Sequence, residues 1–275
     1  RGEWTERAHT ALPAADVEID SPQPALKYLH RKLKGGDLYF FFNEGAEKVQ
    51  VTARLAGFGR PQIWDAESGS MFVVGSARQE RGHIRLPLVL EPHETVFVVL
   101  GPARPGLPEA PRLGRAGETV ELGGAWALSV AGRKLTTRLV PWARFGLSGY
   151  TGTGTYRKEF DRSAGTESGR LFLDLGEVRY SARVRLNGRD LGARAWRPFR
   201  WDITDAIRPG PNTLEIEIAN TPANELSGNP ERRKEVEAKG WLRNSYIGTY
   251  EKFDAEMVPS GLLGPVRLVP YEGKR

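Results

Sequence analysis

The sequence predicts an all-β protein built from two β-sandwich domains, and three observations carry this prediction. Apolar and charged residues alternate over 171–175, 182–186 and 214–218, and a period of two is typical of half-buried strands. Turn residues separate these stretches, as at Asn187-Gly188 and at 209–212 (Pro-Gly-Pro-Asn). With 32 glycines and 19 prolines among 275 residues, and with only short apolar runs, the composition favours many strands joined by tight turns.

The first predicted domain covers residues 22–101. Six or seven short β-type runs lie within about 80 residues, at 25–33, 38–43, 49–55, 61–66, 70–77, 82–90 and 95–101. The first two runs flank Lys34-Gly35-Gly36-Asp37, which predicts a hairpin. Residues 1–21 show no clear period, so we expect them to be a lead-in segment from a missing upstream domain.

A proline-rich linker is predicted over 102–112, where Pro102, Pro105, Pro108 and Pro111 withhold backbone donors and exclude a central strand. The second domain then takes 113–275. Its predicted strands are 118–130, 152–161, those of the 171–220 stretch, and a closing strand at 264–269. Each half is expected to own a hydrophobic core.

A long insertion interrupts the second domain after Asn220. One short helix is predicted inside it, because Asn229-Pro230-Glu231 supplies a cap, a first-turn proline and a first-turn acid, and Gly240 ends the pattern. About 40 residues between two strands is long for a passive connection, and such loops often carry function.

Charge and motif content narrow the classes of partner. The formal charge is +6, but Arg179, Arg183 and Arg185 alternate with apolar residues, which indicates a solvated sheet face. The cluster 232–234 is interleaved with glutamates, as on a salt-bridged helix rather than a nucleic-acid patch. We therefore expect no nucleic-acid partner. No apolar run approaches the roughly 18–20 residues that span a bilayer, so no membrane partner is expected either.

The sequence gives little support for a metal site, a redox site or an activated nucleophile. The chain has no cysteine, and its four histidines (9, 30, 83 and 93) form no zinc-ligand spacing. The Gly-x-Ser-x-Gly motif is absent, and Gly152 and Gly154 indicate a strand rather than a phosphate cradle. We expect no cofactor. A structural Ca²⁺ is common in jelly-roll modules, but the sequence does not place one.

Several short motifs in the second half carry a family resemblance. They are Leu186-Asn187-Gly188, Leu191-Gly192, Trp196, Pro198-Phe199, Asp202-Ile203-Thr204, Gly210, Asn212, Asn220 and the run 259–266. In order and spacing they resemble the sugar-binding jelly-roll domain of glycoside hydrolase family 2. They resemble more closely the C-terminal part of family 106 α-L-rhamnosidase-like proteins. In the first half, His30-Arg31, Asp37, Tyr39-Phe40, Asn43, Trp64-Asp65 and 88–98 are similar to the β-domain that follows the barrel in those proteins.

The resemblance implies that the second domain is a galactose-binding-like jelly roll, that carbohydrate is the partner, and that a catalytic barrel lies upstream of Arg1. It also implies a periplasmic or secreted bacterial protein. The loop at 220–228 approaches the active-site mouth in the resembled enzymes. Here Thr221-Pro222 replaces the aromatic residue usual after that asparagine, which weakens the case for direct sugar contact at this position.

Carbohydrate binding needs aromatic surfaces for the apolar face of a sugar ring and planar polar groups for its hydroxyls. Residues of these types gather at strand ends and in the insertion. The candidates are Trp196, Arg197, Asn220, Asn224, Glu225, Trp241, Asn244, Tyr246 and Tyr250. Packing in the core is the alternative for Trp196, Trp241 and Tyr246, and it is the favoured interpretation for Trp126 and Trp201.

Glycoside hydrolysis needs two carboxyl groups about 5–5.5 Å or 6.5–9.5 Å apart. Candidates within the insertion are Glu225, Glu251, Asp254 and Glu256. In the resembled enzymes, however, the catalytic pair belongs to the barrel, and this chain lacks the alternating β and α pattern of a barrel. The sequence thus favours an accessory, carbohydrate-binding part of a glycoside hydrolase. The alternatives are a chain that hydrolyses glycosides itself and a purely structural brace.

Overall fold

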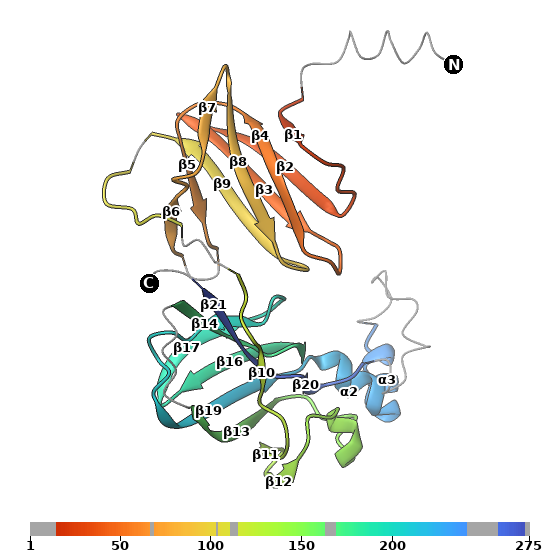
Figure 1. Cartoon of the computed structure of the whole chain (residues 1–275). Coiled ribbons are helices and arrows are strands. Elements are labelled where there is room, and N and C mark those ends of the chain that lie inside the picture. The colour runs from red at the N-terminus through yellow and green to blue at the C-terminus, as the bar shows by residue number, and fades with distance from the viewer. Residues whose placement is uncertain are drawn as a thin grey trace. The chain divides into compact units, whose positions relative to one another are not determined.

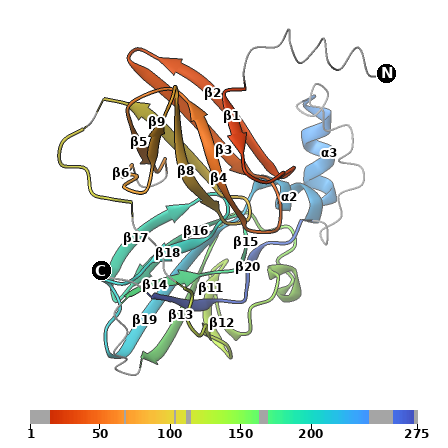
Figure 2. The ribbon, with the colours of Figure 1, turned by 45° about the horizontal axis from the view of Figure 1, so that its top comes forward.

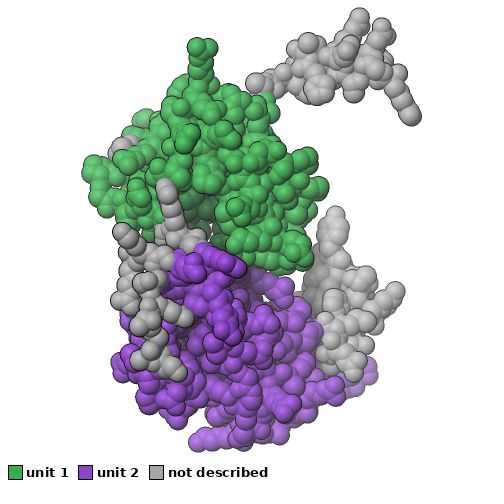
Figure 3. Space-filling model, in the orientation of Figure 1, with its two compact units in different colours: residues 1–111 green, residues 112–275 purple. Residues whose placement is uncertain are grey.

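The computed structural model describes residues 15–66, 69–102, 104–110, 115–162, 169–240 and 258–272. The chain divides into two compact units, residues 1–111 (unit 1) and 112–275 (unit 2), shown in Figures 1 and 3. Both units consist of antiparallel sheets, with two short α-helices in unit 2 among the described residues, which confirms the all-β prediction.

Unit 1 is a sandwich of two sheets. One sheet has the order β1 (Val17–Ile19), β4 (Val49–Ala56), β8 (His83–Leu90), β7 (Arg78–Glu80). The other has the order β2 (Leu26–Leu33), β3 (Gly36–Asn43), β9 (Thr95–Gly101), β5 (Arg60–Trp64), β6 (Met71–Val73). Alternate residues of β3, β4, β8 and β9 form the buried core between the sheets, as their period of two requires.

Two details of unit 1 differ from the sequence prediction. Residues 17–19 of the expected lead-in form an edge strand on β4, too short for its period to be visible in the sequence. Within the expected linker, the backbone of Pro108 and Ala110 hydrogen-bonds to Val73 of β6, so this proline-rich segment runs along a sheet edge. An edge is the place in a sheet where prolines are tolerated.

Unit 2 contains a six-stranded sheet in the order β12 (Arg133–Thr137), β11 (Trp126–Val130), β13 (Thr153–Arg162), β19 (Gly210–Ala219), β16 (Ser181–Leu186), β17 (Arg189–Arg194). A four-stranded sheet has the order β10 (Val120–Glu121), β21 (Arg267–Glu272), β14 (Gly169–Asp174), β18 (Arg200–Asp202). Strands β15 (Glu177–Arg179) and β20 (Gly261–Gly264) form a separate pair.

The core of unit 2 draws on both larger sheets and includes Trp126 and Trp201, which are 1% and 5% exposed. The prediction that these two tryptophans pack in the core is confirmed. The hairpin β16–β17 turns at Asn187-Gly188, both with positive φ, as its sequence predicts. Outside the core, the exposed Arg183 of this hairpin forms a cross-strand ion pair with Asp190.

The described part of the insertion after β19 holds two α-helices rather than the one predicted (Figure 2). Helix α3 (Pro230–Ala238) is the expected one, and the side chain of its cap Asn229 accepts a hydrogen bond from the Arg232 amide. Helix α2 (Pro222–Gly228) is the addition. Thr221 caps it and Pro222 occupies its first turn, so the dipeptide that departs from the resembled family is the start signal of a helix.

Candidate functional site

The candidate site lies at one end of the six-stranded sheet of unit 2. Strand register aligns Ala219 at the end of β19 with Ser181 on one neighbouring strand and Thr153 on the other. Arg194, the last residue of β17, pairs with Ala182 at the same end. The segments that follow β17 and β19 therefore leave the sheet from one end, about 10 Å apart, because one strand separates them.

Trp196 is an exposed aromatic residue near this end of the sheet. It follows β17 by two residues and is 55% exposed, whereas Phe199, three residues further on, is 4% exposed and anchors the segment in the core. Arg197 lies beside Trp196 and is also exposed. An exposed Trp side chain offers a flat apolar surface that suits a sugar ring, and Arg197 adds exposed hydrogen-bond donors on the same segment.

Asn220 serves the fold of the site rather than its surface. Its Nδ2 donates to the Tyr150 carbonyl at 2.7 Å, and its Oδ1 accepts from the Gly152 amide at 2.9 Å. This amide therefore ties the end of β19 to the segment that enters β13. Both polar atoms of the side chain have protein partners, so its predicted role as a sugar ligand gains no support from its contacts.

Asn224 is buried completely and holds the insertion together. Its Nδ2 donates to the Val258 carbonyl at 2.6 Å, and its Oδ1 lies 3.3 Å from the Thr221 amide in a capping box. The side chain thus joins the start of the insertion to its return. A buried amide with these partners is not available to a ligand, which corrects the prediction that Asn224 contacts sugar.

Glu225 lies on α2 and pairs with Arg232 of α3 at 3.3 Å. Arg232 also bonds to Glu235, and Lys239 bonds to Glu235 at 2.6 Å. Hydrogen bonds from Lys239 and Arg232 lower the pKa of Glu235 to about 2. The pair between Glu225 and Arg232 joins α2 to α3 at exposed positions, whereas the other two pairs lie within α3 and its C-terminal cap.

The remaining predicted site residues lie outside the described residues. They are Trp241, Asn244, Tyr246 and Tyr250 of the carbohydrate-binding set, and Glu251, Asp254 and Glu256 of the catalytic set. Of the site residues predicted from the sequence, the structure therefore brings Trp196, Arg197, Asn220, Asn224 and Glu225 to one end of unit 2. Within the described part of the chain, no group of three or more His, Asp or Glu residues is placed to hold a metal ion.

Behind the site lies a buried network that the sequence analysis did not identify. The Trp142 indole donates to the Tyr156 hydroxyl at 2.8 Å, and the Leu262 amide donates to the same oxygen at 3.3 Å. Gly154 and Gly261 permit this approach, because a Cβ atom on either would lie under 3 Å from Trp142. The network fixes β20, where the insertion returns, against β13. Its sequence signal is the pair of glycines.

Known proteins match this chain at two levels. Residues 151–250 match the family model described as "Glycosyl hydrolase 2 galactose-binding domain-like". Unit 2 carries a galactose-binding-like domain of the glycoside hydrolase type. A protein of Formosa agariphila named "Putative beta-glucuronidase" is 34% identical over 143 residues, which cover 45% of this chain and 12% of that protein.

The solved structure of a rhamnosidase from Novosphingobium sp. PP1Y superposes with a TM-score of 0.70 at 29% identity. The match covers 98% of this chain and 26% of the rhamnosidase. The predicted resemblance to family 2 and rhamnosidase-like proteins is confirmed by these matches. The chain spans about an eighth of the length of the glucuronidase relative and about a quarter of the rhamnosidase.

No helix among the described residues is long and apolar enough to span a membrane.

Proposed function

We propose that this chain is the non-catalytic β-sandwich portion of a glycoside hydrolase, and that unit 2 binds carbohydrate or completes the substrate site of a catalytic domain elsewhere in the longer protein. One observation carries the proposal. The match to the rhamnosidase takes in 98% of this chain, and therefore both units, yet only 26% of that enzyme.

The end of unit 2 that holds Trp196 supports carbohydrate as the ligand. Trp196 is an exposed aromatic residue, Arg197 adds exposed hydrogen-bond donors on the same segment, and the buried Phe199 anchors that segment. The insertion beside it is held at both ends by Asn220 and Asn224, so it has a fixed base from which to meet a ligand or a neighbouring domain.

The described carboxylates of the insertion support an accessory role over catalysis in this chain. A hydrolytic site needs an acid and a second carboxylate at a fixed separation. Glu225 instead forms an ion pair with Arg232 at 3.3 Å, so its partner is a cation rather than a second carboxylate.

Hydrolysis of 4-nitrophenyl α-L-rhamnoside and 4-nitrophenyl β-D-glucuronide by the purified chain tests the accessory role. We expect no turnover above that of a heat-denatured sample. Turnover that Glu225→Gln abolishes would replace this proposal with the enzymatic alternative. Turnover that survives Glu225→Gln but is lost in Glu251→Gln, Asp254→Asn or Glu256→Gln would do the same and would assign the carboxylates.

A further inference from the structure

Three turns of unit 1 meet at one end of its sandwich and form what we call the cationic tip: Arg31, Lys32, Leu33, Lys34, Phe58, Arg60 and Arg81. The β2–β3 turn follows the pair Leu33 and Gly36, and the β7–β8 turn stands at the upper end of unit 1 in Figure 1. The Gly57 amide donates to the Gly82 carbonyl at 3.0 Å, which joins the β4–β5 connection to the β7–β8 turn. A Cβ atom on Gly59 would lie 2.4 Å from the Gly101 carbonyl at the end of β9.

The five cations of the tip are Arg31, Lys32, Lys34, Arg60 and Arg81. All are exposed, and none makes an ion pair with a described residue. The nearby carboxylates have other partners. Asp37 and Asp16 lie 2.8 and 2.7 Å from the two ring nitrogens of His30, and Glu80 pairs with Arg54.

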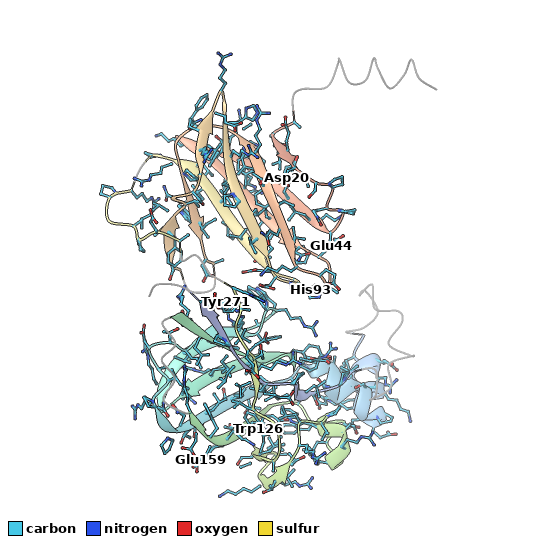
Figure 4. All side chains as sticks on the ribbon, viewed as in Figure 1. Asp20, Glu44, His93, Trp126, Glu159 and Tyr271 are labelled. Carbon is cyan, nitrogen blue, oxygen red and sulfur yellow. The ribbon has the colours of Figure 1, made fainter. Side chains whose placement is uncertain are left out.

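The opposite end of unit 1 shows the contrasting arrangement. Figure 4 labels Glu44 and His93 there. Lys27 pairs with Glu44 at 3.0 Å, and Lys48 pairs with Glu91 at 2.8 Å. Lysines at this end are neutralised within the protein, while those at the tip leave their charge to solvent. Unit 1 is therefore electrically polarised along its strands, with positive potential focused at the tip.

Phe58 is the most exposed large apolar side chain among the described residues, at 69%. It lies between Gly57 and Gly59, whose φ angles are +134° and +107°. A side chain at either glycine would be strained and would collide with the neighbouring strand ends. The backbone is thus committed to a tight connection that presents Phe58 to solvent, with Leu33 (44% exposed) on the adjacent turn.

We propose that the cationic tip is a second binding site, and that its ligand is an anionic polysaccharide carrying carboxylate or sulfate groups. The proposal rests on the proposed function for the class of ligand and on the tip for the charge of that ligand. A pyranose ring packs its apolar face on Phe58, while the guanidinium and ammonium groups around it bind the anionic substituents.

The composition of the tip favours a polysaccharide over other polyanions. A membrane surface would take several apolar side chains into its interface, and the tip offers Phe58 and Leu33 alone among its described residues. Nucleic-acid binding uses several stacking platforms along a basic groove, whereas the tip places one aromatic ring among its cations.

The test is binding of the full chain to dextran sulfate and to polygalacturonate, with neutral dextran as the uncharged probe. The two anionic probes separate sulfate from carboxylate recognition. We expect binding to at least one of them, weakening as salt rises, and no binding to neutral dextran. The double variant Lys32→Glu with Lys34→Glu should reduce affinity about tenfold, because two contacts to anionic groups of the polysaccharide are lost. Phe58→Ser should weaken binding without lowering the melting temperature.

The matched control is Lys134→Glu with Arg208→Glu, an equal change of net charge at exposed positions of unit 2. Equal losses in the control and in the tip variant would mean unspecific attraction and would overturn the proposal. Binding to phosphatidylglycerol vesicles or to RNA more tightly than to either polysaccharide would also overturn it. The tip variants leave Trp196 unchanged, so the two proposals can fail separately. If the unchanged chain showed no binding of neutral glycans at Trp196, that result would count against the proposed function and not against the cationic tip.

Discussion

Removing the hydroxyl of Tyr156 tests how the base of the insertion is held. This oxygen accepts hydrogen bonds from the Trp142 indole and the Leu262 amide, and all three side chains are 0% exposed. Burial raises the pKa of the Tyr156 hydroxyl, so this group is neutral at neutral pH. Tyr156→Phe keeps the ring and leaves two buried donors without their acceptor.

The expected cost follows from those two donors. A buried donor that loses its partner costs about 1–3 kcal/mol, and the missing oxygen leaves only a small void. We expect the free energy of unfolding of unit 2 to fall by about 3 kcal/mol. For a unit of this size, that loss lowers the melting temperature by roughly 6–12 °C.

The measurement is calorimetry of the full chain, together with hydrogen exchange of the Leu262 amide, which should lose protection. Tyr150→Phe is the matched control, because its hydroxyl donates to the Thr153 carbonyl at an exposed position. The control should cost under about 1 kcal/mol. If Tyr156→Phe destabilises no more than Tyr150→Phe, the network does not hold the base of the insertion.

Three further predictions concern unit 2. The hydrogen bond from Arg183 lowers the pKa of Asp190 to about 2, so the ion pair stabilises the hairpin above about pH 4, and this stabilisation is lost as the pH falls from about 4 towards 2. NMR titration of Asp190 should place the midpoint near 2, and a midpoint near 3.8 would contradict the pairing. Glu225→Gln should change stability by less than about 1 kcal/mol, because the pair with Arg232 is exposed; a larger loss by urea denaturation would show that the pair secures α2. Residues 112–275 expressed alone should unfold cooperatively, since their core is internal to unit 2; a gradual, non-cooperative transition would argue against the two-domain division.

The strands could be predicted because their causes are local. Period-two runs such as 214–218 bury every second residue in the structure, and Asn187-Gly188 makes the predicted hairpin turn. Helix α3 begins where its sequence predicts, because Asn229 and Pro230 act within one turn of each other. Burial of Trp126 followed from its place in an alternating strand.

The roles of the site residues could not be predicted from local pattern. Asn220 bonds to a residue 70 positions away, and Asn224 to one 34 positions away, so the fold alone brings their partners together. The exposure of Trp196 depends on which neighbours the sandwich places around it. Helix α2 was not predicted, although Thr221 and Pro222 are a local start signal for it.

Binding of neutral oligosaccharides to the full chain and to Trp196→Ala tests the central claim most directly. Isothermal titration with a panel of neutral oligosaccharides should show that at least one of them binds to the unchanged chain. Affinity should fall about tenfold or more in Trp196→Ala, as for a central aromatic anchor, with an unchanged melting temperature. Val120→Ala, an exposed apolar residue elsewhere in unit 2, should bind as the unchanged chain does. The claim would be contradicted if the chain bound none of the oligosaccharides, or if Trp196→Ala bound them as tightly as the unchanged chain.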